Sequence, residues 1–270
     1  MNSAALTMNS AVLTRVDAGV AHVTLNRPEK RNALDRTTVA ALTSELRRCA
    51  ADAAVRVVQI TGTGKVFCAG ADLGEMQAQA TADEAANLAD AEQLATLLGV
   101  LDSMPKPTLA RVNGDGYGGA LGLMAACDIV VAVDSARFAF TEVRLGIIPA
   151  VISPFVLGKI GQQAARRYFL TAEALSAAAL KELGLVHEVV ADGLLDTACA
   201  SITETLLQGA PGAQAQAKVL IRDMAHPAAG DRAAASMEAA GRLARLRVQE
   251  EAQEGFSAFF NKRKPGWRRN

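Results

Sequence analysis

The stretch "VNGDGYGGALGLMAACDI" (Val112 to Ile129) places five glycines at the start of an apolar, helix-forming run. Glycine lets a ligand approach the backbone closely, because it has no Cβ. The first turn of a helix presents unpaired N–H groups and the positive end of the helix dipole. The stretch therefore predicts a helix whose first N–H groups hold an anion or polarise a carbonyl; a tight turn with close helix–sheet packing is the alternative. No GK[ST] follows it, which argues against a phosphate loop.

Strand-like and helix-like segments alternate on both sides of this stretch. Strands are expected at Val20–Asn26, Val55–Gly62, 106–114 and 128–133, and helices after the cap residue Asp35 and over 83–104. After Pro149 the chain is alanine-rich and helical, apart from "LVHEVV" at Leu185–Val190. This order predicts an α/β core over residues 1–190 and a helical region over 191–270. Residues 1–17 are expected to form a partly loose lead-in.

The composition excludes several classes of function. The 270 residues carry 28 basic and 28 acidic side chains, so no global positive field indicates a nucleic-acid partner. The four cysteines are scattered without ligand spacing, which favours free thiols and predicts no metal site. No apolar run approaches the ~20 residues of a membrane span, and no targeting pattern begins the chain, so we expect a cytoplasmic protein without a membrane partner.

A second glycine-containing loop, "FCAGADL" (Phe67 to Leu73), also follows a predicted strand. Two loops that follow parallel strands converge at the carboxyl edge of a sheet, where ligands of α/β proteins bind. One backbone N–H from each loop makes an oxyanion hole, in which each donor is worth ~3 kcal/mol in the transition state.

Six motifs together resemble the crotonase superfamily, also called the enoyl-CoA hydratase/isomerase family. They cover nearly the whole chain in the family's order: "LNRPEKRNAL" (25–34), "FCAGADL" (67–73), "VNGDGYGGALGLMAACDI" (112–129), "FAFTEVRLGIIP" (138–149), "LGLVHEVV" (183–190) and "EGFSAFFNKRKP" (254–265). The resemblance implies a spiral of ββα turns, an α/β fold, and a helical C-terminal region that makes trimers or hexamers. It also implies acyl-CoA substrates, with coenzyme A entering as part of the substrate and no separate cofactor.

The resemblance also assigns site residues position by position. The oxyanion donors match the N–H groups of Ala71 and Gly119, and a catalytic glutamate matches Glu142. Positions that match contacts to the coenzyme A portion or the acyl group are Arg31, Ala33, Ala69, Asp72, Leu73, Tyr117, Gly118, Gly122, Phe259 and Lys262. Phe259 and Lys262 match positions that often meet adenine or phosphate, and we expect Tyr117 to line the acyl pocket.

This chain departs from the family's pattern at one catalytic position. Hydratases of the family commonly carry a second glutamate, three residues after the oxyanion glycine, and that position is Gly122 here. A mechanism with two carboxylates therefore cannot apply unchanged, and the glycine is expected to leave room for the acyl group. Glu142 alone can activate a water for hydration, or shuttle a proton between carbons as an isomerase does.

The finer expectations concern the substrate. "GYGGALGL" together with "EVRLGIIPAVISPFV" resembles bacterial 3-methylglutaconyl-CoA hydratases of leucine breakdown, whose substrate is branched and ends in a carboxylate. Arg144 is the candidate partner of that carboxylate. Two alternatives remain open: an enoyl-CoA isomerase that uses Glu142 alone, and a CoA- or RNA-binding homologue that has lost catalysis.

Overall fold

The structure is a computed structural model that describes residues 11–225 and 232–268. The chain divides into two compact units: a core unit of Met1–Met104 and Thr108–Ser201, and a C-terminal unit of Pro105–Pro107 and Ile202–Asn270. The sequence places the boundary at residue 190, which is the last residue of the last strand. The division lies later because the buried residues Leu195 and Cys199 belong to the core unit.

The larger sheet of the core unit has six strands in the order β1-β2-β3-β5-β7-β10. Their bounds are β1 Val12–Asp17, β2 Val20–Leu25, β3 Val57–Gly62, β5 Thr108–Val112, β7 Ile129–Val133 and β10 Glu188–Val190. All neighbours pair in parallel except β1 and β2, which are antiparallel. The parallel strands β3, β5 and β7 are almost wholly buried, which explains why most of their residues are apolar.

The expectation of a loose lead-in up to residue 17 is wrong for Val12–Asp17, which form β1. Ala18 and Gly19 join β1 to β2, and both have positive φ angles, 47° and 88°. Two such residues in succession form the tight turn that matches the twist of a hairpin. Residues 1–10 of the lead-in lie outside the described residues.

A second, smaller sheet was not predicted. It consists of β4 Val66–Cys68, β6 Asp115–Tyr117, β8 Arg137–Ala139 and β9 Leu175–Ser176, in that order. Strands of two or three residues carry too little alternation to be recognised in a sequence. β4, β6 and β8 are parallel, so the segments that follow them start at the same edge of this sheet.

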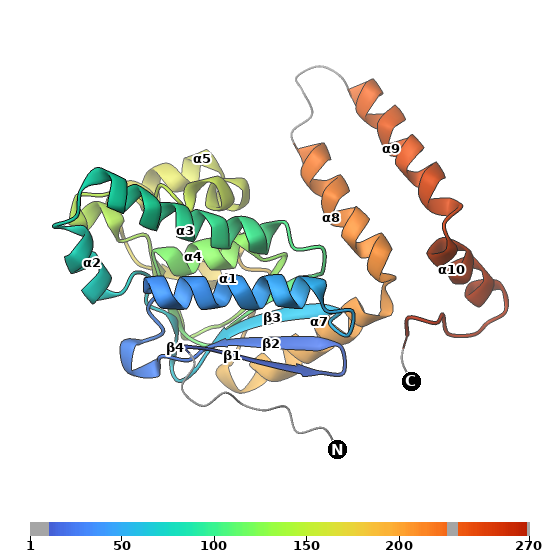
Figure 1. The fold of residues 1–270 in the computed structure, drawn as a ribbon, viewed down its shortest axis with the longest axis horizontal. Helices are drawn as coiled ribbons and strands as arrows, with labels where there is room; N and C mark the ends of the chain where they lie inside the picture. The colour runs from blue at the N-terminus through green and yellow to red at the C-terminus, as the bar shows by residue number, and fades with distance from the viewer. Residues whose placement is uncertain (1–10, 226–231, 269–270) are drawn as a thin grey trace. The chain divides into compact units, whose positions relative to one another are not determined.

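Helices cover the core unit. They are α1 Arg36–Ala51, α2 Leu73–Gln79, α3 Glu84–Asp102, α4 Gly119–Ala126, α5 Ser153–Thr171, α6 Ala177–Glu182 and α7 Leu195–Gln208, with the short 3-10 helices η1 Pro28–Lys30, η2 Glu142–Leu145 and η3 Asp192–Leu194. The expected cap of α1 is confirmed, since Asp35 Oδ1 accepts the Thr38 N–H at 2.7 Å. Figure 1 shows α1 beside β1 and β2, with α3 packed against α1.

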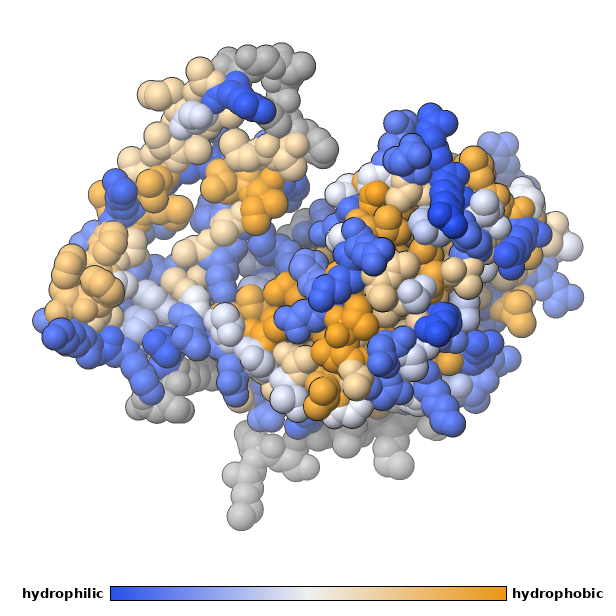
Figure 2. All heavy atoms as spheres, turned by 180° about the vertical axis from the view of Figure 1, so that it is seen from behind, coloured by the Kyte–Doolittle hydropathy of each residue, from blue (hydrophilic) through white to orange (hydrophobic). Residues whose placement is uncertain are grey.

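The C-terminal unit contains the end of α7 and the helices α8 Pro211–Ala225, α9 Arg232–Arg247 and α10 Glu250–Phe260. An ion pair between Arg242 of α9 and Asp223 of α8 joins two of them at 2.7 Å. On the left of Figure 2, hydrophobic and hydrophilic residues alternate over this unit. No helix within residues 11–225 and 232–268 is both long and apolar enough to cross a membrane. The predicted α/β core with a helical C-terminal region is confirmed.

Candidate active site

The two glycine-containing loops meet where β4 and β6 end. A Cβ on Gly70 would lie 2.6 Å from the Tyr117 carbonyl oxygen and 3.6 Å from the Gly119 backbone nitrogen. Gly70 also has a φ of +83°, so a side chain is disfavoured there by both space and conformation. The loop after β4 therefore lies directly against the start of α4, as the sequence pattern predicts.

A short backbone bridge orients Ala71 in the loop after β4. The Leu34 N–H donates to the Gly70 carbonyl at 2.7 Å, and the Asp72 N–H donates to the Leu34 carbonyl at 3.1 Å. In extended backbone, successive N–H groups point to opposite sides. Because the flanking groups of residues 70 and 72 face Leu34, the Ala71 N–H faces away from it.

Gly119 supplies the second donor. It is the first residue of α4, and the first N–H groups of a helix have no partner within the helix. All later residues of α4, from Ala120 to Ala126, are buried, so the positive end of this helix dipole acts in a partly dry environment. A Cβ on Gly119 would lie 3.5 Å from Leu34 Cδ1, which places Leu34, the bridge partner of Ala71, beside the Gly119 donor.

Glu142 brings a carboxyl group to the same place. It begins η2, shortly after β8, which pairs in parallel with β6. A Cβ on Gly118 would lie 3.3 Å from Glu142 Oε1, so this carboxyl group lies next to the residue that precedes the Gly119 donor. Glu142 Oε2 is buried and has no hydrogen-bond partner among residues 11–225 and 232–268. Burial raises the pKa of Glu142, and a bond from its own backbone N–H only partly offsets that effect.

The space beside Gly122 differs from the expectation. A Cβ on Gly122 would lie 3.1 Å from Ile152 Cβ and 3.2 Å from Leu98 Cδ1, and it would overlap Ile152 Cγ2. Both neighbouring side chains are buried. The glycine therefore does not leave an opening where a side chain at 122 would begin, because Ile152 already occupies that volume.

Several residues expected to touch the coenzyme A portion lie in or around the loop after β4. The Arg31 carbonyl accepts the Ala69 N–H at 3.0 Å, and the Arg31 side chain is exposed. Ala33 is buried and offers its carbonyl to Arg27. Leu73, the first residue of α2, is 82 % exposed, an open position for an apolar side chain next to the proposed site.

Asp72 and Tyr117 have partners within the protein. Asp72 caps α2 through the Gly74 N–H at 2.8 Å and pairs with Arg27 at 3.0 Å. The Tyr117 hydroxyl donates to Asp115 Oδ2 at 3.1 Å. Phe259 and Lys262 belong to the C-terminal unit, at the end of α10 and just after it.

Sequence reasoning missed two residues that build this site. Arg27 contacts the segments on both sides of the backbone bridge. Asn32 is 1 % exposed, and its side-chain amide donates to the carbonyls of Thr63 and Val66, which flank the turn before β4. The sequence contained one signal for these two residues. Both lie in the motif "LNRPEKRNAL", but polar side chains in a loop are ordinarily exposed to water, so neither was expected to build the site.

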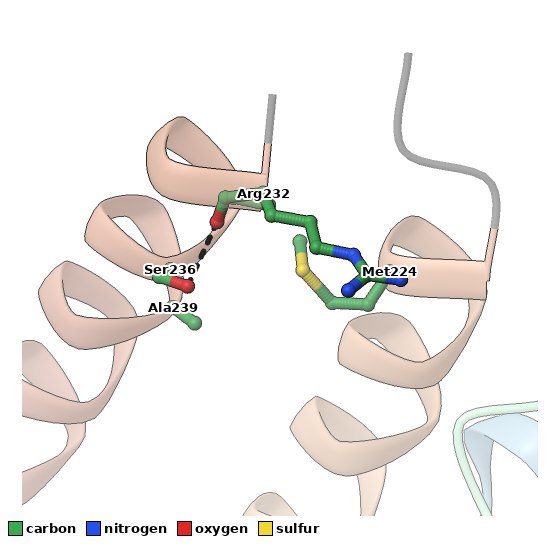
Figure 3. Close-up of a pocket in the computed structure, with 5 residues that line it drawn as sticks. Met224, Arg232, Ser236 and Ala239 are labelled. Atoms are coloured by element: carbon green, nitrogen blue, oxygen red, sulfur yellow. Dashed lines mark hydrogen bonds between the residues drawn. The ribbon is translucent and has the colours of Figure 1, made fainter. Parts of the chain in front are cut away.

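A pocket in the C-terminal unit is lined by fewer side chains that are suited to catalysis. It lies between α8 and α9 and is lined by Met224, Arg232, Ala235, Ser236 and Ala239. In Figure 3 the Arg232 side chain extends towards Met224, and the Ser236 hydroxyl bonds the Arg232 carbonyl at 2.8 Å. These five lining residues include no carboxylate, imidazole or thiol. Across residues 11–225 and 232–268, no group of three or more His, Cys, Asp or Glu side chains is placed to hold a metal.

Comparisons with known proteins identify the family of this chain. Residues 15–270 match the model of the family described as "Enoyl-CoA hydratase/isomerase". The 2,3-dehydroadipyl-CoA hydratase of Escherichia coli is 34 % identical over 91 % of this chain and 94 % of its own length. The (E)-benzylidenesuccinyl-CoA hydratase of Thauera aromatica is 33 % identical over 95 % of this chain and 98 % of its own.

Solved structures support the same assignment. The crystal structure of an enoyl-CoA hydratase from Shewanella pealeana superposes with a TM-score of 0.92 and 40 % identity, covering 96 % of each chain. The chain belongs to the enoyl-CoA hydratase/isomerase family and has the crotonase fold of its enzymes.

Proposed function

We propose that this enzyme adds water to the 2,3-double bond of a branched enoyl-CoA thioester, with Glu142 as the single acid and base. The observation that carries this proposal is the carboxyl group of Glu142. Its Oε2 is buried without a hydrogen-bond partner among the described residues, and its Oε1 lies beside Gly118, the residue before the first N–H of α4. A carboxyl group with a raised pKa and an open acceptor is suited to proton transfer near neutral pH.

The mechanism follows from these positions. The thioester oxygen accepts hydrogen bonds from the N–H groups of Ala71 and Gly119. Glu142 removes a proton from a water molecule, whose oxygen forms a bond to the β-carbon. The electrons of the double bond move towards the thioester, and the resulting enolate oxygen is stabilised by the two donors. Protonated Glu142 then returns its proton to the α-carbon, which completes a 3-hydroxyacyl-CoA and regenerates the carboxylate.

The proposed substrate is 3-methylglutaconyl-CoA, which ends in a free carboxylate. The two relatives act on dehydroadipyl and benzylidenesuccinyl thioesters, which also carry a carboxylate in the acyl group. Arg144 is the proposed partner, since it lies two residues after Glu142 in η2 and its side chain is exposed. A charge-assisted hydrogen bond of this kind is worth ~1.5–3 kcal/mol, or roughly 10- to 100-fold.

Arg144→Met tests the substrate proposal. We expect kcat/KM for 3-methylglutaconyl-CoA to fall by about 10- to 100-fold, while kcat/KM for crotonyl-CoA, which has no carboxylate, stays near the wild-type value. Arg167→Met is a matched control, because Arg167 is an exposed arginine of the same unit that pairs with Glu173. Equal losses on both substrates would contradict the assignment of Arg144.

A second function, migration of the double bond, uses the same groups. Glu142 would remove a proton from one carbon and return it to another, with no water involved. Hydratases of the family commonly carry a second glutamate at the position of Gly122, but here Ile152 fills that volume. This favours a mechanism with one carboxylate, whether the reaction is hydration or migration of the double bond. A panel of enoyl-CoA thioesters, followed separately for 3-hydroxyacyl-CoA and for the shifted alkene, distinguishes them. Formation of neither product would contradict both.

We also propose that the chain self-associates as a trimer or hexamer through its C-terminal unit. Large apolar side chains are exposed there: Ile221, Met237, Leu243, Val248, Phe256, Phe259 and Phe260. Apolar surface of this extent is typical of an interaction site. Light scattering at micromolar concentration is expected to show at least three chains, and a stable monomer would contradict the proposal.

A further inference from the structure

The Arg27 side chain joins the two segments that carry the first oxyanion donor. Its Nη1 donates to the Ala33 carbonyl at 2.8 Å and lies 3.0 Å from Asp35 Oδ2. Its Nη2 lies 3.0 Å from Asp72 Oδ2. Ala33 and Asp35 flank Leu34, and Asp72 follows Ala71. One guanidinium group therefore contacts both sides of the bridge between Leu34 and Ala71.

These contacts act at a point where the backbone has few other constraints. The bridge is isolated, with one residue pair and two hydrogen bonds. The segment beyond it enters α2, a helix of seven residues with no buried side chain. Packing therefore does little to hold Ala71, which is exposed, and the orientation of its N–H depends on polar contacts at this point.

The arrangement is partly shielded from water. The side chains of Arg27, Asp35 and Asp72 are 17 %, 22 % and 11 % exposed. Charged hydrogen bonds are stronger at such positions than on an open surface, and the planar guanidinium suits several acceptors at once. Burial alone would raise the pKa of Asp72, but hydrogen bonds from the Gly74 N–H and Arg27 hold it below its usual value.

We propose that Arg27 is a positioning residue, which keeps the Ala71 N–H aimed at the thioester oxygen by clamping Asp72 to the segment around Leu34. Arg27 does not touch the substrate in this proposal, and its effect passes through one backbone donor. The inference rests on the proposed function, because it takes the Ala71 N–H as an oxyanion donor. A purely structural role of Arg27 in folding is the alternative.

Two variants distinguish a positioning role of Arg27 from a purely structural role. Arg27→Met removes the guanidinium and keeps an apolar side chain of similar length. Asp72→Asn weakens the pairing with Arg27, while its side-chain oxygen still accepts the Gly74 N–H that caps α2. Arg111→Met is the control, since Arg111 is similarly buried, at 20 % exposure, and pairs instead with Asp196 and Thr61.

The readouts are kcat, KM, the melting temperature and the infrared carbonyl stretch of bound butyryl-CoA labelled with ¹³C at the thioester carbon. Butyryl-CoA has no double bond and cannot react, so the carbonyl frequency reports polarisation alone. A full oxyanion donor is worth ~10²–10³-fold in kcat, and a misplacement of about 1 Å costs ~10²-fold. We expect Arg27→Met to lower kcat by about 10- to 100-fold, with little change in KM.

The carbonyl stretch should move towards its value in free butyryl-CoA for Arg27→Met, and part of the way for Asp72→Asn. The double variant should lose little more than Arg27→Met alone, because both changes break the same contact. Arg111→Met should leave kcat and the carbonyl frequency at wild-type values, even if its melting temperature falls.

One result would contradict the positioning role of Arg27, and a different result would contradict the proposed function. If wild-type protein polarises the carbonyl and hydrates an enoyl-CoA, but folded Arg27→Met and Asp72→Asn do so equally well, Arg27 is not a positioning residue. If wild-type protein neither polarises the carbonyl nor turns over any thioester of the panel, the proposed function itself is wrong.

Discussion

Replacing Gly122 by alanine tests whether this glycine is required by packing against Ile152. The change adds one methyl group to α4, at a position 3.1 Å from Ile152 Cβ and 3.2 Å from Leu98 Cδ1. Ile152 is 3 % exposed and Leu98 is fully buried, so neither side chain can move out towards water. The added methyl group must therefore displace packed atoms.

The expected magnitude combines two opposing effects. Overpacking of a core costs ~1–3 kcal/mol. Alanine is favoured over glycine inside a helix by ~1 kcal/mol. Gly122→Ala should therefore destabilise the native state by about 0–2 kcal/mol.

The sign should reverse once Ile152 is shortened. Ile152→Ala removes the Cγ2 methyl group that the new side chain overlaps. The Cβ of residue 152 remains at 3.1 Å and has to give by only a few tenths of an ångström, and Leu98 Cδ1 is the flexible end of its side chain. In that background, Gly122→Ala should stabilise the protein by up to ~1 kcal/mol. The coupling between the two sites is then about 1–3 kcal/mol, in the range measured for residues in direct contact.

The assay is urea unfolding of the four proteins of this cycle at one protein concentration, because self-association makes apparent stability depend on concentration. Gly158→Ala serves as the control: Gly158 lies in α5, and a Cβ there would meet nothing within 4 Å. It should have the same effect in both backgrounds. If Gly122→Ala also had the same sign and size in both, Ile152 would not be what excludes a side chain at 122.

Two further substitutions and one labelling experiment test the same geometry. Glu142→Gln should lower kcat by ~10²–10⁴-fold in the hydration assay with little change in KM, because it removes the base and keeps the shape; wild-type turnover would contradict the role of Glu142. Burial raises the pKa of Glu142, so the native state binds the proton more tightly than the unfolded chain, and ionisation costs stability as the pH rises. Glu142→Gln should accordingly melt above wild type at pH 8, and this difference should vanish below the ordinary carboxyl value of 4.5. Gly70→Ala should destabilise the protein and abolish turnover, since its Cβ would lie 2.6 Å from the Tyr117 carbonyl at a positive φ; a folded, active variant would refute the contact between the loops. Burial raises the pKa of the Cys68 thiol to about 12, so native protein at pH 8 should resist iodoacetamide at this position, and rapid labelling there would count against its burial.

The sequence alone determined the class of the fold and proposed where the candidate site lies. The apolar strands, the cap at Asp35 and the glycines around Gly119 are local signals, since each reports the backbone conformation or burial of its own segment. The family's motifs then pointed to Ala71, Gly119 and Glu142. The structure places the loops that carry these residues next to one another.

Only the tertiary structure decided what surrounds those residues. The second sheet, the clamp of Arg27 on Asp72 and the filling of the space at Gly122 by Ile152 all join segments that lie far apart in the chain. Such contacts leave no periodicity in a single sequence, because each partner looks like an ordinary loop or core residue by itself. The glycine at 122 is the plainest case: the sequence suggested an open space, and packing from a distant residue had already closed it.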